Sequence, residues 1–79
     1  MSAQVNEVLA EAIETFRSKR TGHRFQLSEL FAADRWEAIP VGVRRHAGTV
    51  FLKWAEAHLG EVECLGPDDE NHQQYRKLS

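Results

Sequence analysis

The chain has 79 residues and a net charge of −2; 42% of the residues are hydrophobic and 28% are charged. This balance is typical of a small globular domain and excludes a disordered tail, and the net charge excludes a strongly basic, nonspecific nucleic-acid binder. The length predicts one domain over residues 1–79. No apolar run is long enough to cross a bilayer and the first twenty residues carry glutamates, so we expect a cytoplasmic protein with no membrane partner.

The first predicted helix covers residues 5–16, where apolar side chains recur at spacings of three and four. Glutamates occupy its opposite side, and Gly22 marks its stop. Basic side chains follow the helix, where they either complement its dipole or bind the phosphates of a nucleic acid. These candidate phosphate contacts are Arg17, Lys19, Arg20 and Arg24.

A short strand and a helical segment come next. Residues 23–27 alternate polar and apolar side chains, which predicts a strand. Ser28 can cap a helix that begins at Glu29, and Asp34 can cap a second helical turn. The pattern leaves open whether residues 29–39 form one bent helix or two short ones.

The longest predicted helix covers residues 41–59, and its apolar positions again recur at spacings of three and four. Pro40 suits the first helical turn, and Gly60 suits the left-handed residue that ends a helix. Gly48 lies inside the helix, where glycine is unfavourable, so we expect it to permit a close approach by the helix of residues 5–16. On that interpretation, Gly48→Leu destabilises the fold by overpacking.

Two further strands are predicted at residues 61–65 and 72–78, joined by a loop at 66–71 that is dense in turn residues. We expect the strand of residues 23–27 to complete a three-stranded sheet, since a hairpin alone is marginally stable. Cys64 is the single cysteine, which rules out an intramolecular disulfide and predicts a buried strand position. The predicted order of helix, short strand, helical pair, long helix and C-terminal β-hairpin is that of an α+β, winged-helix-like domain.

Several short motifs between residues 25 and 75 carry a resemblance to a known family. They are Phe25-x-Leu27-x-x-Leu30, Trp36-x-x-Ile39-Pro40, Gly42-x-Arg44, Gly48-x-x-Phe51 and Asn71-x-x-x-Tyr75. This set resembles a family of small bacterial and phage domains of unknown function. The resemblance implies a winged-helix-like module in a bacterial or prophage setting, and it brings no catalytic residue.

The long helix carries the candidate nucleic-acid contacts. In helix-turn-helix proteins the N-terminal residues of the recognition helix meet base edges, and arginine there can bond bidentately to guanine. This favours a small DNA-binding regulator that contacts double-stranded DNA through Arg44, Arg45, Thr49 and Lys53, with Arg76 and Lys77 in a wing. The alternative for Arg44 and Arg45 is an ion pair with Glu37 or with the acidic loop. A specific operator role would require a homodimer or repeated sites.

The acidic loop at residues 66–71 favours a second function, because its carboxylates would repel a DNA backbone. Asp68, Asp69 and Glu70 suit contact with a protein partner instead. The alternative function is therefore a protein-protein interaction module, or a phage or prophage accessory factor acting through this loop.

Enzyme chemistry finds no support in the sequence. There is no Ser-His-Asp order with diagnostic flanks and no phosphate-binding glycine loop. His23, His46 and His58 lack a zinc-ligand spacing, and Trp36 and Trp54 fall on helical apolar faces that predict core positions. We therefore expect a noncatalytic binding module with no catalytic residue, no metal and no cofactor.

Overall fold

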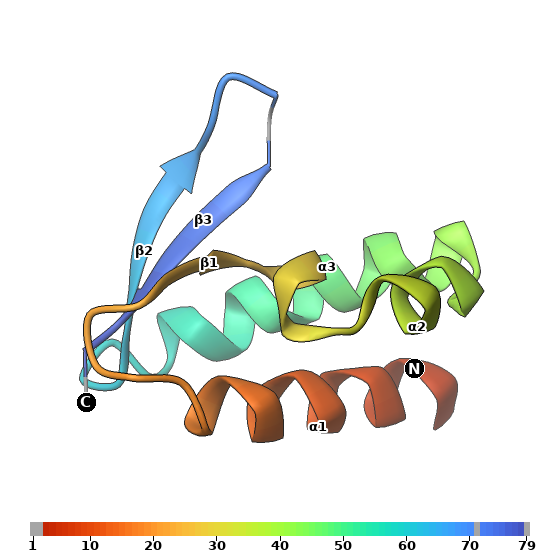
Figure 1. Cartoon of the computed structure of the whole chain (residues 1–79), viewed down its shortest axis with the longest axis horizontal. Coiled ribbons are helices and arrows are strands. Elements are labelled where there is room, and N and C mark those ends of the chain that lie inside the picture. Colours follow the sequence, from red (N-terminus) through yellow and green to blue (C-terminus); the bar gives the residue numbers. More distant parts are fainter. Residues whose placement is uncertain (1–2, 71, 79) are drawn as a thin grey trace.

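The computed structural model describes residues 3–70 and 72–78, and its elements follow the predicted order (Figure 1). In chain order they are α1 (Ala3–Arg17), β1 (Arg24–Gln26), the 3-10 helix η1 (Leu27–Leu30), α2 (Ala33–Ala38), α3 (Val41–Glu56), β2 (Val62–Pro67) and β3 (Gln73–Lys77). The predicted α+β fold class, with its short first strand and its C-terminal hairpin, is confirmed.

The three strands form one antiparallel sheet in the order β1-β3-β2, so the last strand lies in the centre. Phe25 of β1 and Cys64 of β2 both lie opposite Tyr75 of β3. The predicted three-stranded sheet is therefore confirmed. A bulge between Cys64 and Gly66 leaves Leu65 without a partner in β3, and Gly66 has a φ of 90°, a conformation that glycine adopts at little cost.

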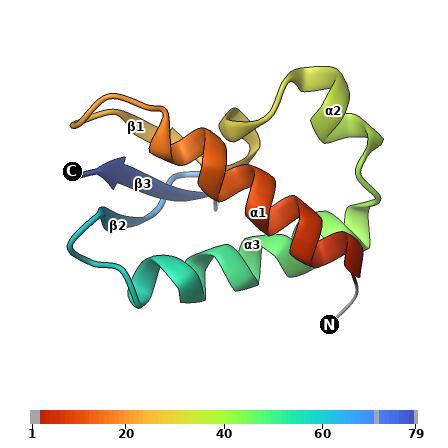
Figure 2. The same cartoon turned by 90° about the horizontal axis from the view of Figure 1, so that it is seen from below.

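The core lies where α1 and α3 pack on each other and on the sheet (Figure 2). Both helices bury small and aromatic side chains at helical spacing, because these positions share one face of a 3.6-residue period. The buried residues of the two helices are Val5, Val8, Ala12 and Phe16 in α1 and Ala47, Phe51 and Ala55 in α3. The sheet contributes Phe25, Val62 and Tyr75 to the same core.

The segment between β1 and α3 forms two short helices, η1 and α2, which settles the choice left open above. Both predicted caps are wrong. The chain passes from β1 directly into η1, so that Gln26 is the N-cap and its backbone N–H donates to the Glu29 carboxylate at 3.0 Å. Helix α2 starts after Ala32, which places Asp34 inside the first turn and not at the cap.

The ends of α3 also differ from the prediction. Pro40 is the N-cap with a φ of −55° and a ψ of 143°, so it precedes the first helical turn. The helix ends at Glu56, three residues earlier than residue 59, and Ala57 is its C-cap. The glycines with positive φ in the described residues are Gly22 and Gly66, so Gly60 does not end the helix in a left-handed conformation.

Lys77, near the end of β3, is buried, with 8% of its surface exposed. Its Nζ donates to the carbonyl oxygens of Arg17 at 2.8 Å and Lys19 at 2.7 Å, where α1 ends. The last carbonyls of a helix lack partners within the helix, and a cation there is favoured by the helix dipole. The expected wing role of this lysine is therefore wrong. Its neighbour Arg76 pairs with Glu63 across the hairpin.

Candidate nucleic-acid interface

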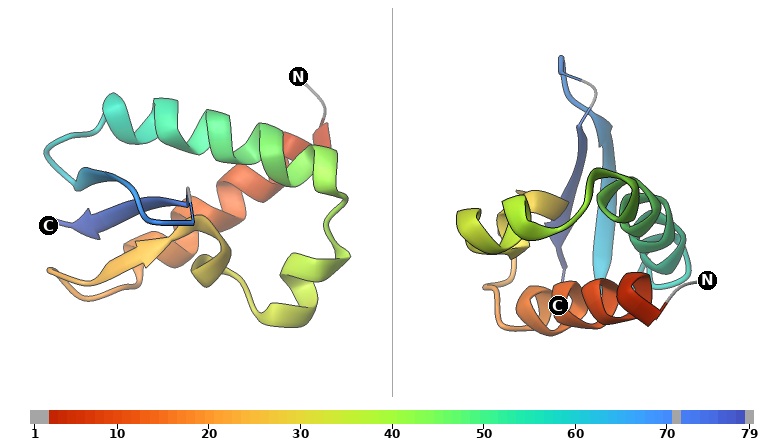
Figure 3. Two further views of the ribbon diagram at one scale, coloured as in Figure 1. Left: turned by 90° about the horizontal axis from the view of Figure 1, so that it is seen from above. Right: turned by 90° about the vertical axis from the view of Figure 1, so that its right-hand side faces the viewer.

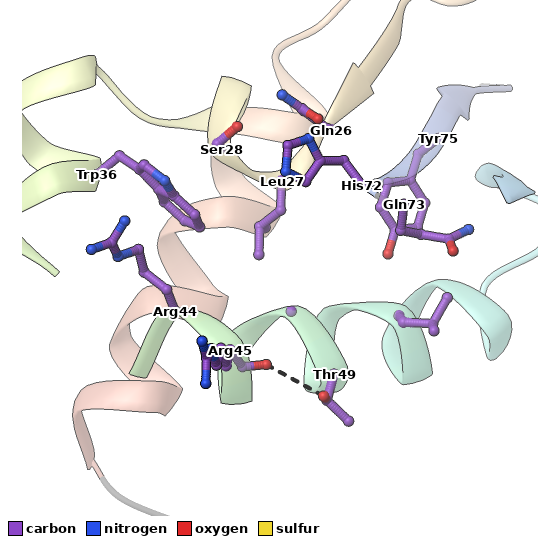
Figure 4. Close-up of a pocket in the computed structure, with 12 residues that line it drawn as sticks. Gln26, Leu27, Ser28, Trp36, Arg44, Arg45, Thr49, His72, Gln73 and Tyr75 are labelled. Carbon is purple, nitrogen blue, oxygen red and sulfur yellow. Dashed lines mark hydrogen bonds between the residues drawn. The ribbon is translucent and has the colours of Figure 1, made fainter. Parts of the chain in front are cut away.

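A groove of about 720 Å³ lies between the N-terminal half of α3, the segment of η1 and α2, and the start of β3 (Figure 4). We call it the α3 groove. Its lining combines two arginines with neutral polar and apolar side chains and includes no aspartate or glutamate. The lining residues are Gln26, Leu27, Ser28, Trp36, Arg44, Arg45, Gly48, Thr49, Leu52, His72, Gln73 and Tyr75.

Helix α3 has a buried face and an exposed face, and Arg45 and Thr49 of the exposed face also line the groove. One face, with Ala47 and Phe51, is buried against α1 and the sheet. The other face carries Arg45, Thr49 and Lys53 at four-residue intervals, and all three are exposed. An interval of four residues aligns side chains along one side of a helix, so they form a row that the helix presents to solvent.

Arg44 occupies one end of the groove with its guanidinium group fixed by two contacts. Its Nε donates to the carbonyl oxygen of Ile39 at 2.9 Å, and its guanidinium carbon lies 5.7 Å from the centroid of the Trp36 ring. In the described part of the chain neither Arg44 nor Arg45 forms an ion pair. The alternative interpretation, in which these arginines pair with Glu37 or the acidic loop, is wrong for these residues.

Trp36 has a role that sequence reasoning missed. Its ring packs on Phe31 at a centroid distance of 5.4 Å, in keeping with the predicted core position, but it also lines the groove beneath Arg44. His72 and Gln73 were missed as well, because strand pairing brings them to the groove from a distant part of the chain. No sequence signal pointed to these contributions, because they depend on how α2 and β3 pack around α3.

Gly48 lies at the floor of the groove and not against α1. A Cβ atom at this position would meet only Leu27, whose Cδ2 would be 4.0 Å away, which is ordinary van der Waals contact. The expected close approach of α1 is therefore wrong. Because no backbone is close, the position has room for a side chain directed into the groove.

The basic residues after α1 lie at the opposite end of the molecule from the start of α3 (Figure 1). Arg17 pairs with Glu61 at 3.7 Å, and both side chains are exposed. Arg20 and Arg24 are exposed and form no ion pair in the described residues. The structure therefore brings Arg44, Arg45 and Thr49 together and leaves the predicted residues Arg17, Lys19, Arg20 and Arg24 apart from them.

β2 extends to Pro67, two residues beyond its predicted end, so of the predicted acidic loop residues 68–70 lie at the tip of the hairpin, which stands between α2 and α3 (Figure 3, right). Asp68 organises this turn: its carboxylate accepts backbone N–H bonds from Glu70 at 2.9 Å and His72 at 2.8 Å, and a side-chain bond from Gln74 at 3.2 Å. Asp69 and Glu70 are exposed. Of the three predicted protein-contact residues, Asp68 therefore has a structural role within the loop itself.

The Cys64 thiol and the Tyr75 phenol have pKa values raised above their usual ranges. Burial and the nearby Glu56 carboxylate raise the pKa of the Cys64 thiol. Burial, with smaller contributions from Cys64 and Glu56, raises the pKa of the Tyr75 phenol far above its usual range. Both groups therefore keep their protons at neutral pH.

The described residues contain no cluster of three potential metal ligands and no helix long and apolar enough to span a membrane.

Comparison with known proteins supports the fold and identifies a family. A solved structure titled "SCCmec type IV LP1413 - nucleic acids binding protein" superposes with a TM-score of 0.78 at 18% sequence identity, covering 100% of this chain and 92% of that one. At this identity the likeness shows a shared fold. No curated protein matches the sequence. A family model described as a domain of unknown function (DUF1413) matches residues 10–77, and the chain therefore belongs to this family, as its motifs predicted.

Proposed function

We propose that this protein is a noncatalytic nucleic-acid-binding module, a small DNA-binding regulator that uses the N-terminal half of α3. The observation that carries the proposal is the lining of the α3 groove. A chain with more acidic than basic side chains here places Arg44 and Arg45 side by side and keeps every carboxylate out of the lining. Such a surface attracts a polyanion although the whole molecule is acidic.

The chemistry of the surrounding side chains supports the same ligand. Guanidinium groups bind phosphates and the guanine edge, and the Ser28 hydroxyl can donate to a phosphate oxygen. The Thr49 hydroxyl donates to the Arg45 carbonyl at 3.3 Å, a bond that it would exchange for one to a phosphate. The exposed row of Arg45, Thr49 and Lys53 extends this surface along α3. The similar solved structure is titled a nucleic acids binding protein, which favours the same class of ligand for this chain.

The direct test measures DNA affinity by fluorescence anisotropy across a salt series, with labelled duplex and single strands of the same random sequence. We expect the dissociation constant to rise steeply with salt, because binding releases counterions from the neutralised phosphates. The variant with Arg44→Ala and Arg45→Ala should bind roughly 100-fold more weakly, with a salt slope reduced by about two, as expected for two lost contacts.

A matched control separates the α3 site from general charge. Arg20→Ala with Arg24→Ala removes the same charge from the opposite end of the molecule, and we expect its affinity to stay within about threefold of the wild type. An equal loss in both double variants would show that α3 is not the binding site. Absence of binding to either form of DNA at low salt would refute the nucleic-acid proposal, whereas the duplex and single-strand arms together decide which form is preferred.

Substitutions at Gly48 test whether the groove itself receives the ligand. Gly48→Ala should raise the free energy of unfolding by roughly 0.5–1 kcal/mol, because alanine favours the helix and its Cβ fits. Gly48→Leu extends further and should weaken DNA binding roughly tenfold by obstructing the groove. Thermal melts and the anisotropy assay measure the two effects. Full affinity in a folded Gly48→Leu variant would show that DNA stays outside the groove.

The second candidate function uses the hairpin tip, where Asp69 and Glu70 are exposed and Asp68 is occupied by the turn. A protein partner with a basic surface would bind these two carboxylates. Charge reversal by Asp69→Lys with Glu70→Lys should then abolish its capture, and should leave the turn folded because Asp68 is retained. If the reversal instead strengthens DNA binding and no partner is lost, the hairpin tip only repels the DNA backbone.

A regulator that reads a defined operator needs two recognition helices, supplied either by a homodimer or by single copies on repeated sites, and of these we propose the homodimer. Sedimentation velocity with and without a duplex measures this directly. A complex containing one copy of the chain on every duplex would contradict dimeric binding.

A further inference from the structure

Arg44 is half-buried, and its guanidinium group is held by two contacts to neutral groups of the protein, which leaves its charge unpaired in the described residues. The Nε–H donates to the Ile39 carbonyl at 2.9 Å, and Ile39 is 1% exposed, so the acceptor belongs to the rigid interior. The guanidinium carbon lies 5.7 Å from the centroid of the Trp36 ring, within the range of a cation-π interaction. Trp36 in turn packs on Phe31.

These contacts leave the outer edge of the guanidinium group available. In the described residues, the N–H groups on its two Nη atoms have no hydrogen-bond partner, and no carboxylate lines the groove that they share with Arg45, Ser28 and Thr49. The planar pair of Nη donors matches the spacing of two phosphate oxygens. Since the side chain is already ordered, binding a phosphate costs less rotamer entropy than it would for a free arginine.

We propose that Arg44 is a preorganised phosphate-binding fork, and that Trp36 and the Ile39 carbonyl are the groups that position it. The ligand is a phosphodiester of the bound nucleic acid, so the inference rests on the proposed function and specifies its anchor point. Arg45 is the natural comparison, because it neighbours Arg44 in the groove but is exposed and has no anchoring side-chain contact in the described residues.

The first test exchanges each arginine for lysine, which retains the charge and removes the fork. We expect Arg44→Lys to weaken DNA binding about tenfold, because lysine cannot keep the Ile39 bond and also present two parallel donors. Arg45→Lys should cost less than about twofold, as expected where only charge matters. The salt slope should stay unchanged in both, whereas Arg44→Ala alone should lower it by about one.

The second test asks whether Trp36 acts through Arg44. Trp36→Leu should weaken binding about fivefold and Trp36→Phe less than about twofold, because phenylalanine restores an aromatic face. Melting curves fix an assay temperature at which every variant is folded. In an Arg44→Ala background Trp36→Leu should have no further effect, whereas a purely structural tryptophan would lower affinity in both backgrounds.

The outcomes separate this inference from the function on which it rests. If the wild type binds DNA and Arg44→Lys and Arg45→Lys lose affinity equally, Arg44 is not a preorganised phosphate-binding fork, and the proposed function stays intact. If Trp36→Leu weakens DNA binding as much in the Arg44→Ala background as in the wild type, Trp36 does not act by positioning Arg44. A wild-type protein that binds no nucleic acid would refute the proposed function, and this inference with it.

Discussion

Phe51→Ala is expected to lower the free energy of unfolding by about 3–5 kcal/mol, the largest effect of any single substitution considered. Phe51 is 0% exposed, and its ring lies 5.1 Å from Tyr75, 5.5 Å from Trp54 and 6.4 Å from Phe25, measured between centroids. Removing the ring opens a cavity at the point where α3 meets the sheet and also removes three aromatic contacts. Alanine cannot fill that volume, and the surrounding side chains belong to helices and strands that other contacts hold in place, so they do not collapse into the cavity.

For a chain of 79 residues this loss is a large part of the total stability, which typically amounts to roughly 0.05–0.15 kcal/mol per residue. Urea denaturation followed by circular dichroism measures the change. Lys53→Ala serves as the control in the same helix, because Lys53 is exposed, and should shift stability by less than about 0.5 kcal/mol. A similar small shift for Phe51→Ala would mean that α3 does not pack through this ring.

Lys77→Met is the second large effect, with an expected loss of about 2–3 kcal/mol. Methionine is one atom shorter than lysine but retains an unbranched apolar chain beside the Phe16 ring, whose centroid lies 5.5 Å from Nζ. It removes the charged donor that bonds the carbonyl oxygens of Arg17 and Lys19. These carbonyls would then lose their partner at the end of α1, so the last turn of the helix should fray.

Arg76→Met provides a matched control, because Arg76 is the adjacent residue of β3 and carries the same charge in an ion pair with Glu63 whose side chains are 45% and 41% exposed. Exposed pairs contribute about 0–1 kcal/mol, so this variant should remain close to the wild type. Hydrogen exchange of the amides near residue 17 reports the fraying directly. Equal stability of the Lys77 and Arg76 variants, with unchanged exchange, would exclude a capping role.

The sequence predicted those features of the fold that depend on local pattern. The spacing of apolar residues in α1 and α3 identified both helices, because that spacing reports which side of a helix is apolar. The turn residues at 66–71 identified the hairpin, because they lie between two short apolar segments. The caps failed for a related reason. Ser28 and Asp34 have suitable side chains, but pairing of β1 with β3 fixes where the strand ends and where η1 begins.

The candidate site was predicted only in part, because its groove is made by elements that are distant in sequence. Arg44, Arg45 and Thr49 were identified from their place in the long helix, and the structure brings them together. The contributions of Trp36 and His72 depend on how α2 and β3 pack around that helix, which periodicity does not report. For the same reason Gly48 was assigned to the wrong neighbour. That DNA contacts these residues remains a prediction.

The bond network of Lys77 also has a consequence for how the protein is made. A chain emerges from the ribosome starting at its N-terminus, so α1 is complete long before the lysine that closes its C-terminal turn. β1 must likewise wait for β3, its partner in the sheet. During synthesis the last turn of α1 therefore lacks this bond, and β1 lacks its neighbour in the sheet, until β3 has been made.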